Sequence, residues 1–412
     1  MRSADILKSL SQQAIEREDR YGAHNYHPLP VVLERGEGIH VWDVEGKRYF
    51  DFLSAYSALN QGHNHPAIVQ ALIDQLKRLS LTSRAFHNDR LGVYEEYITR
   101  YFGYDKVLPM NTGAEGVETA LKLCRRWAYE KKGISEDHAK IIVCEGNFHG
   151  RTITAISASS DPDSYGKFGP FTPGFVKIPY NDVAALERAL EDPNVAGFLI
   201  EPIQGEAGVI VPDEGYLRAC ATACKAKNVL FIADEIQTGL CRTGRMLACD
   251  HESVRADIVI LGKALSGGLL PVSAILADDE IMLCIRPGQH GSTYGGNPLA
   301  AAVAIAALEV LKSEGLADRS AKLGRILLSE LRSINHPMIH EVRGKGLFCA
   351  LELKPDGDFT AWDFCMAMMK NGLLAKPTHG NIVRFAPPLI IDETSLLECT
   401  GIIRRTFDQF GL

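Results

Sequence analysis

The stretch DIVILGKALSGG, residues 257–268, combines an apolar run with a single lysine, and this combination is the starting point for predicting the fold. Four apolar residues, 258–261, lead to Gly262 and Lys263, and small residues with two glycines follow. Such an apolar run is typical of a buried strand, so the strand would end by delivering one long cationic side chain into a patch of small residues. Taken alone, the pattern favours an ordinary solvated lysine. The rest of the sequence decides whether Lys263 has a chemical task instead.

Three other short apolar runs resemble this one. They read KIIVCEG at residues 140–146, GFLIEPI at 197–203 and VLFIADE at 229–235. Helix-like segments lie between them, such as 183–190 and 215–227. Strands that are apolar on both faces and alternate with helices indicate a mostly parallel sheet covered on both sides, in the α/β class.

The two ends of the chain have different patterns. Residues 38–53 alternate around Glu45 and Gly46, which predicts a hairpin. The apolar stretch 299–308 predicts a buried helix, and the segments after it predict a smaller α+β domain. We therefore expect an N-terminal segment with a hairpin, a large domain and a small C-terminal domain, with the bounds 1–56, 57–317 and 318–412.

Composition excludes several classes of protein. The chain has 412 residues, 46% of them hydrophobic and 23% charged, and a formal charge of −7, which argues against a nucleic-acid surface. No apolar stretch is long enough for a membrane span. The ten cysteines have no disulfide or metal-site rhythm, so we expect free thiols in a reducing compartment and no metal. The N-terminal stretch favours the cytoplasm, with a processed mitochondrial form as the alternative.

Polar residues follow four of the expected strands. They are residues 147–149 after the first, Glu201, Gln204 and Glu206 after the second, Asp234 and Gln237 after the third, and Lys263 after the fourth. Ligands of open α/β sheets bind beyond the carboxyl ends of the strands. The sequence therefore predicts one crevice that these side chains share.

Lys263 and Asp234 together point to pyridoxal 5'-phosphate (PLP). A lysine that forms a Schiff base needs desolvation and room for a planar ligand, which the apolar strand and the small residues supply. A carboxylate at the end of an apolar strand needs a cationic partner, and the protonated ring nitrogen of PLP is one. The alternative for Asp234 is a cap of the next turn.

A phosphate site is expected where the stretch MNTGAEGVETALKL, residues 110–123, begins a helix. Gly113 and Ala114 stand at the helix start, where backbone N–H groups bind phosphate. A plain capping turn made by Thr112 and Glu115 is the alternative, and both descriptions are compatible. The loop HGSTYGGNP, residues 290–298, is a second candidate. Two apolar side chains that follow strands, Phe148 and Ile236, could enclose the cofactor ring, although each alone is more often core packing.

These motifs resemble the PLP-dependent class III aminotransferases, and the resemblance covers nearly the whole chain. It is carried by YGAHNYHPLPVVLERG, DFLSAYSALNQGH, PMNTGAE, NFHGRT, EPIQGEAG, ADEIQTGLCRTGR, LGKALSGG, HGSTYGGNP, VRGKGL and LLAKPTHGNIVRFAPP. The N-terminal stretch with Tyr26 and Tyr56 is most similar to the ornithine-specific branch. The resemblance implies the PLP-dependent aminotransferase fold, known as fold type I.

The resemblance also implies a role for each matching residue. It implies that Lys263 forms the Schiff base and transfers the proton, that Asp234 binds the ring nitrogen of PLP, and that Gln237 binds its phenolic oxygen. Phe148 and Ile236 would pack against the two faces of the ring. The phosphate would be bound by Gly113, Ala114, Ser292 and Thr293. In this family the residue matching Thr293 comes from the neighbouring subunit, so a homodimer is implied, with higher oligomers left open. Tyr26, Tyr56 and Arg151 match the substrate pocket, and Glu206 and Arg384 match a paired acid–base gate. We expect His149 to be structural rather than catalytic.

The implied substrates are L-ornithine, which gives up its δ-amino group, and 2-oxoglutarate. A glutamate that masks an arginine in one half-reaction and releases it in the other would let one site accept both. Without the resemblance, an ordinary ion pair between Glu206 and Arg384 would be preferred. The alternatives are another ω-aminotransferase acting on acetylornithine or 4-aminobutyrate, a PLP aminomutase or decarboxylase, and a cofactor-binding protein without activity.

Overall fold

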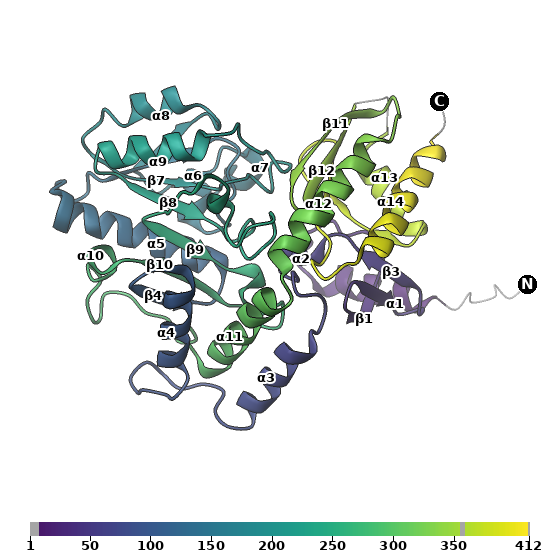
Figure 1. The fold of residues 1–412 in the computed structure, drawn as a ribbon, viewed down its shortest axis with the longest axis horizontal. Coiled ribbons are helices and arrows are strands. Elements are labelled where there is room, and N and C mark those ends of the chain that lie inside the picture. Colours follow the sequence, from purple (N-terminus) through teal and green to yellow (C-terminus); the bar gives the residue numbers. More distant parts are fainter. Residues whose placement is uncertain (1–7, 355–358, 411–412) are drawn as a thin grey trace, which may run out of the picture.

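A seven-stranded sheet forms the core of the larger part of the molecule (Figure 1). The computed structural model describes residues 8–354 and 359–410. The strand order is β4-β10-β9-β8-β7-β5-β6. The strands are β4 (Lys106–Met110), β5 (Lys140–Cys144), β6 (Phe175–Ile178), β7 (Val195–Ile200), β8 (Leu230–Asp234), β9 (Ile258–Leu261) and β10 (Ser273–Ala277). Only the pairs that β10 makes with β4 and β9 are antiparallel, so the predicted mostly parallel sheet is confirmed.

The parallel register brings the ends of the central strands to one edge. Ile200 pairs with Ala233, and Asp234 pairs with Ile260. The residues that follow β7, β8 and β9 therefore lie at nearly the same level along the strand direction. The apolar runs decide this arrangement, because strands buried on both faces cannot slide without moving core residues.

Helices cover both faces of this sheet, as predicted. Alternate residues of β5 show the division: Ile141 and Val143 pack in one core cluster, and Ile142 and Cys144 pack in the other. The first cluster includes residues of α5 (Gly113–Trp127), and the second includes residues of α8 (Val183–Ala189), α9 (Tyr216–Ala226) and α11 (Pro298–Ser313). The helices expected at 183–190, 215–227 and 299–308 are thereby confirmed.

The remaining helices connect and flank these elements. They are α1 (Leu10–Tyr21), α2 (Ser54–Ser57), α3 (Pro66–Leu76), α4 (Leu91–Phe102), α6 (Ile153–Ala158), α7 (Pro162–Tyr165), α10 (Asp279–Met282), α12 (Leu316–Arg332), α13 (Ala361–Lys370) and α14 (Glu393–Asp408), with short helical turns at Ala128–Lys132, Ala248–Glu252 and Lys263–Ser266. None of the described helices has the length and apolar character that crossing a membrane requires.

Two four-stranded sheets lie in the smaller part of the molecule, beside α12, α13 and α14 (Figure 1). One has the order β11-β12-β15-β14 and the other the order β1-β2-β3-β13. Their strands are β1 (Leu33–Glu37), β2 (His40–Asp43), β3 (Arg48–Asp51), β11 (Ile339–Lys345), β12 (Phe348–Leu353), β13 (Leu373–Leu374), β14 (Lys376–Pro377) and β15 (Ile382–Phe385).

The hairpin expected around Glu45 and Gly46 is the antiparallel pair β2–β3. Its strand β3 pairs in parallel with β13, so the two ends of the chain share one sheet. The domain bounds 1–56, 57–317 and 318–412 stay predictions; α12 crosses the second boundary.

Candidate active site

A cavity of about 250 Å³ opens at the carboxyl edge of the parallel strands. Every strand that was expected to deliver a polar residue there contributes to its lining. The lining residues are Gly113, Ala114, Phe148, His149, Gly150, Glu201, Glu206, Asp234, Ile236, Gln237, Thr238 and Lys263. The predicted shared crevice therefore exists.

Lys263 enters this cavity from a strained position. It begins a short 3₁₀ turn after β9, and its φ of 44° is in the left-handed region, which residues other than glycine seldom adopt. Burial lowers the pKa of the Lys263 amine, and the nearby Arg384 acts in the same direction, while Glu206 opposes it. A lower pKa favours the uncharged form of the amine, which is the nucleophilic form.

Asp234 is buried beside His149 at the floor of the cavity. Its Oδ2 lies 2.7 Å from His149 Nδ1, and its Oδ1 accepts the N–H of Ile236 at 3.2 Å. Burial disfavours the imidazolium form of His149, but the hydrogen bond and charge of Asp234 outweigh it and raise its pKa. His149 Nε2 is buried and has no hydrogen-bond partner among the described residues. His149, which we expected to be structural, lies on the cavity wall.

The N-terminus of α5 forms another wall. Thr112 and Glu115 make a capping box: the Glu115 N–H donates to Thr112 Oγ1 at 3.2 Å, and the Thr112 N–H donates to Glu115 Oε2 at 2.7 Å. The capping turn and the glycine approach thus occur together. A Cβ on Gly113 would lie 3.0 Å from Ile236 Cδ1, so the absence of a side chain there leaves room for Ile236.

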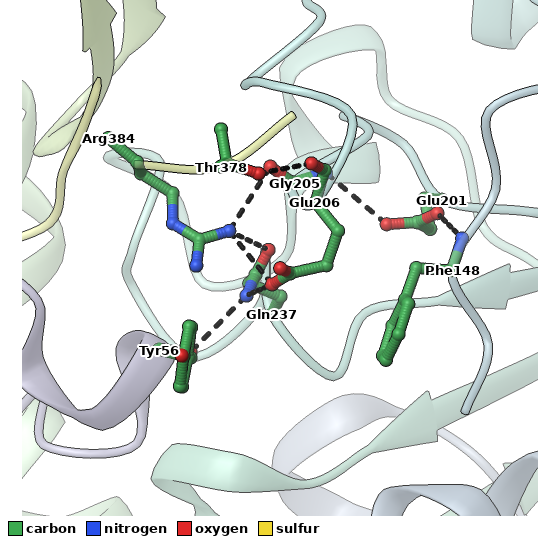
Figure 2. A network of polar contacts seen from close by, with 8 residues as sticks. All are labelled: Tyr56, Phe148, Glu201, Gly205, Glu206, Gln237, Thr378 and Arg384. Carbon is green, nitrogen blue, oxygen red and sulfur yellow. Dashed lines mark hydrogen bonds and ion pairs between the residues drawn. The ribbon is translucent and has the colours of Figure 1, made fainter. Parts of the chain in front are cut away.

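Glu201 links two segments of the cavity wall (Figure 2). Its Oε1 accepts the N–H of Phe148 at 2.7 Å, and its Oε2 accepts the N–H of Gly205 at 3.3 Å. Burial raises the pKa of Glu201 to about 7, with the charge of His149 opposing the shift. Glu201 was predicted only to follow a strand, and its two backbone contacts are a finding of the structure.

Glu206, which lines the cavity, forms an ion pair with the buried Arg384 (Figure 2). Arg384 Nη1 lies 2.8 Å from Glu206 Oε1 and also donates to the carbonyl oxygen of Gly205 at 3.1 Å. Gln237 Nε2 donates to the same Glu206 oxygen at 3.1 Å. Burial works against the carboxylate, but Arg384 and then Lys263 lower the pKa of Glu206, so it stays ionised. Thr378, which the sequence did not single out, donates through its hydroxyl to the carbonyl oxygen of Glu206.

Tyr56 lies against this pair, whereas Tyr26 and Arg151 lie further out. The guanidinium carbon of Arg384 is 5.1 Å from the centre of the Tyr56 ring. The Arg151 guanidinium is 5.4 Å from the Phe148 ring. Tyr26 is 71% exposed, and together with Tyr56 it lines a separate apolar groove of about 500 Å³.

The second phosphate candidate is outside the cavity lining. Ser292 Oγ accepts a hydrogen bond from Asn111 Nδ2 at 3.0 Å, which places it near the start of α5. Thr293 is exposed. Within the single chain, the structure does not bring Ser292 or Thr293 together with Lys263.

The cavity presents a set of groups that fits PLP. It offers an amine with a lowered pKa, a buried carboxylate, an amide side chain, two apolar side chains and a helix N-terminus. A Cβ on Gly205 would lie 1.5 Å from Gln237 Oε1, so this glycine is required for the amide to take its place. These groups therefore match the chemical groups of PLP, which are an aldehyde, a ring nitrogen, a phenolic oxygen and a phosphate.

Comparisons with known proteins agree with this geometry. The family model described as Aminotransferase class-III matches residues 21–407. A rat protein named ornithine aminotransferase, mitochondrial, is 62% identical over 97% of this chain and 91% of its own length.

Two solved structures show the same fold. An ornithine aminotransferase from Toxoplasma gondii, described with partial occupancy of PLP at its active site, has a TM-score of 0.95 and 51% identity over 97% of this chain and 94% of its own. An acetylornithine aminotransferase from Elizabethkingia anophelis has a TM-score of 0.90 and 57% identity over 98% of this chain and 100% of its own. The aminotransferase fold is thereby confirmed, and the chain belongs to the class-III aminotransferase family.

Proposed function

We propose that this protein is an ornithine δ-aminotransferase, which transfers the δ-amino group of L-ornithine to 2-oxoglutarate. The products are glutamate 5-semialdehyde, which closes to pyrroline-5-carboxylate, and L-glutamate. The observation that carries the proposal is the ion pair between Glu206, in the cavity lining, and the buried Arg384, 2.8 Å apart and beside Tyr56. The similarity to the ornithine aminotransferases supports it.

The cofactor of this family is PLP, which supplies an electron sink for the carbon that loses a proton. Lys263 would hold its aldehyde, Asp234 its ring nitrogen and Gln237 its phenolic oxygen. Phe148 and Ile236 would enclose its ring. Gly113 and Ala114 would hold its phosphate together with Ser292 and with Thr293 of a second subunit.

The chain's own groups would move and hold the protons. The Lys263 amine has a lowered pKa and would accept a proton from the substrate carbon and return it. Asp234 lies at the cavity floor, where the contact of its Oδ2 with His149 Nδ1 at 2.7 Å fixes the position of the carboxylate. Glu201 holds the backbone of Phe148 in place.

The gate would sort the two substrates. No arginine is among the described residues that line the cavity, and Glu206 occupies Arg384, so the α-carboxylate of ornithine would be held away, near Tyr26, Tyr56 and Arg151. When Glu206 moves off, Arg384 can bind a carboxylate of 2-oxoglutarate in a bidentate manner. Gln237 Nε2 steadies the closed arrangement through its hydrogen bond to Glu206.

The alternative is an aminotransferase acting on acetylornithine, favoured by the 57% identity to the Elizabethkingia anophelis protein. One experiment separates the two. L-ornithine, N-acetylornithine and 4-aminobutyrate are each added alone to the yellow, cofactor-loaded protein, and the absorption spectrum is followed. We expect ornithine to bleach it fastest; a faster reaction with acetylornithine would overturn the proposal.

The cellular location is a further proposal. All ten cysteines are free and buried, which suits a reducing compartment. We propose the cytoplasm, with the mitochondrial matrix as the alternative because the rat relative is named mitochondrial. Fractionation of cells that express the protein distinguishes the two.

A further inference from the structure

The backbone of residues 54–57 forms a left-handed turn that contains no glycine. Its φ angles are 49° at Ser54, 47° at Ala55, 62° at Tyr56 and 71° at Ser57. This conformation is unfavourable for L-amino acids, which adopt it as single residues rather than as consecutive ones. Such strain persists only where the surroundings impose it, and it concentrates at functional sites.

The turn presents Tyr56 to the gate (Figure 2). The Tyr56 ring lies 5.1 Å from the guanidinium carbon of Arg384, and its carbonyl oxygen accepts a hydrogen bond from Gln237 Nε2 at 3.4 Å. Both of these residues also contact Glu206. The ring and the backbone of Tyr56 are thus fitted to the same network.

Long-range hydrogen bonds fix both ends of the turn. Before it, the Phe52 N–H donates to Leu374 O at 2.8 Å, and Phe52 O accepts from the Ala386 N–H at 2.7 Å. After it, Asn60 Nδ2 donates to Leu240 O at 2.7 Å. One end is therefore tied next to the strand of Arg384, and the other is tied to the loop that carries Gln237.

A carboxylate at the start of the turn acts together with backbone hydrogen bonds, in which the N–H groups of Tyr56 and Ala58 donate to Leu53 O at 3.0 Å and to Ser54 O at 2.9 Å. The hydroxyls of Ser54 and Ser57 are buried and have no hydrogen-bond partner among the described residues. Asp51 Oδ1 accepts the N–H of Leu53 at 2.9 Å and the N–H of Ser54 at 2.8 Å. Asp51 Oδ2 lies 2.8 Å from His63 Nε2, which orients the carboxylate.

We propose that Asp51 is a positioning residue for substrate binding. Through the N–H groups of Leu53 and Ser54 it holds the left-handed turn, and the turn keeps Tyr56 at the gate. The inference rests on the proposed function, in which Tyr56 belongs to the ornithine pocket. Asp51 itself does not take part in the chemistry.

The test is steady-state kinetics of the cofactor-loaded protein. Asp51→Ala should raise KM for L-ornithine by about tenfold and change kcat by less than about threefold, because hydrogen bonds to a charged acceptor are lost and the proton-transfer groups stay in place. Asp51→Asn keeps an oxygen that accepts both N–H groups, so KM should stay within about threefold of wild type. The absorption spectrum of the bound cofactor should be the same in all three proteins.

Asp43→Ala is the matched control. Asp43 is buried in the same sheet as Asp51, and its Oδ1 likewise accepts two N–H groups, those of Glu45 at 3.1 Å and Lys47 at 2.8 Å. It should lower the melting temperature but leave KM for ornithine within about twofold. A purely structural role for Asp51 predicts the same behaviour for both alanine variants.

If Asp51→Ala does not fold, substitutions of the exposed Ala55 test the left-handed turn through which Asp51 would act. Ala55→Val disfavours the left-handed turn and should raise KM for ornithine, whereas Ala55→Asn has similar bulk, tolerates that conformation and should not. A folded Asp51→Ala with wild-type KM, or equal effects of the two Ala55 variants, would overturn this inference alone. A wild-type protein that leaves ornithine unchanged would overturn the proposed function and this inference with it.

Discussion

The position of Lys263 is energetically unfavourable, which indicates a functional rather than a structural role. The lysine has a left-handed backbone conformation, and burial disfavours its charged form. A solvated lysine at a strand end would need neither. The charge of Glu206 acts to raise the pKa of Lys263, but burial and Arg384 act to lower it, and the lowering prevails.

Lys263→Ala should reduce aminotransfer from ornithine by at least about a thousandfold, because the amine that accepts and returns the proton is lost. Turnover is measured as formation of pyrroline-5-carboxylate. Lys132→Ala is the control: burial also lowers the pKa of Lys132, but its amine donates to Val195 O at 2.6 Å, at the far end of β7. Near wild-type turnover in Lys263→Ala would contradict its role.

Asp234→Asn should keep the shape of the cavity floor and lose its negative charge. We expect a loss of several kcal/mol of transition-state stabilisation, on the order of a hydrogen-bonded charge at a reacting centre. The measurement is kcat/KM for ornithine. Asp257→Asn serves for comparison, because Asp257 is a partly buried carboxylate that accepts the Phe231 N–H at 2.7 Å at the opposite end of the sheet. A rate within about threefold of wild type, less than ~1 kcal/mol, would rule out this role of Asp234.

At the scale of elements, the strand ends were the predictable part of the site. Asp234 ends a strand, and Glu201 and Lys263 lie just beyond two others. These strands are apolar and alternate with helices, which predicts a buried parallel sheet, so the meeting of the three side chains at one edge can be inferred from the sequence. The pairing of β13 with β3 joins residues more than 300 positions apart and leaves no local signal. The left-handed turn at Ser54–Ser57 contains no glycine and was equally hidden. The hydrogen-bond partners of His149 and Thr378 lie far from them in the sequence, so the hydrophobic periodicity gives no sign of these contacts.

The gate joins two elements, the loop after β7 and strand β15. Glu206→Ala should leave Arg384 free beside the cofactor, where it attracts carboxylates in a bidentate manner. The α-carboxylate of ornithine should then compete for Arg384 and bring the α-amine to the reacting position. We expect the preference for the δ-amine over the α-amine to fall by about tenfold, equivalent to one charge-assisted hydrogen bond. NMR of labelled ornithine separates pyrroline-5-carboxylate from the α-keto product.

The control for this variant is a second arginine–glutamate pair in the same part of the molecule. Arg343 Nη1 lies 2.6 Å from Glu352 Oε2, and Arg343 Nε donates to Gly208 O at 2.9 Å. Glu352→Ala removes a comparable charge away from the cavity and should keep the δ-amine preference. If Glu206→Ala also keeps it, the pair with Arg384 is only structural, and selectivity comes from Tyr26, Tyr56 and Arg151.

At the scale of the whole molecule, the single chain leaves one expected ligand group out of the site. Thr293 is exposed and does not line the cavity, although the family resemblance gives it to the phosphate. Its neighbour Tyr294 is 57% exposed. A homodimer in which each subunit lends Thr293 to the other would account for both observations. We expect light scattering to give twice the mass of the chain.

Mixing two inactive variants tests whether the site is shared. Lys263→Ala lacks the amine, and Thr293→Glu places a negative charge where the phosphate would bind, so each homodimer should be inactive. After subunits exchange, half of the dimers are mixed, and one of the two sites in each mixed dimer combines an intact Lys263 with an intact Thr293 from the other chain. About a quarter of wild-type turnover should therefore return. If Thr293 acted within its own chain, both sites of the mixed dimer would carry a defect, and no activity would return after exchange.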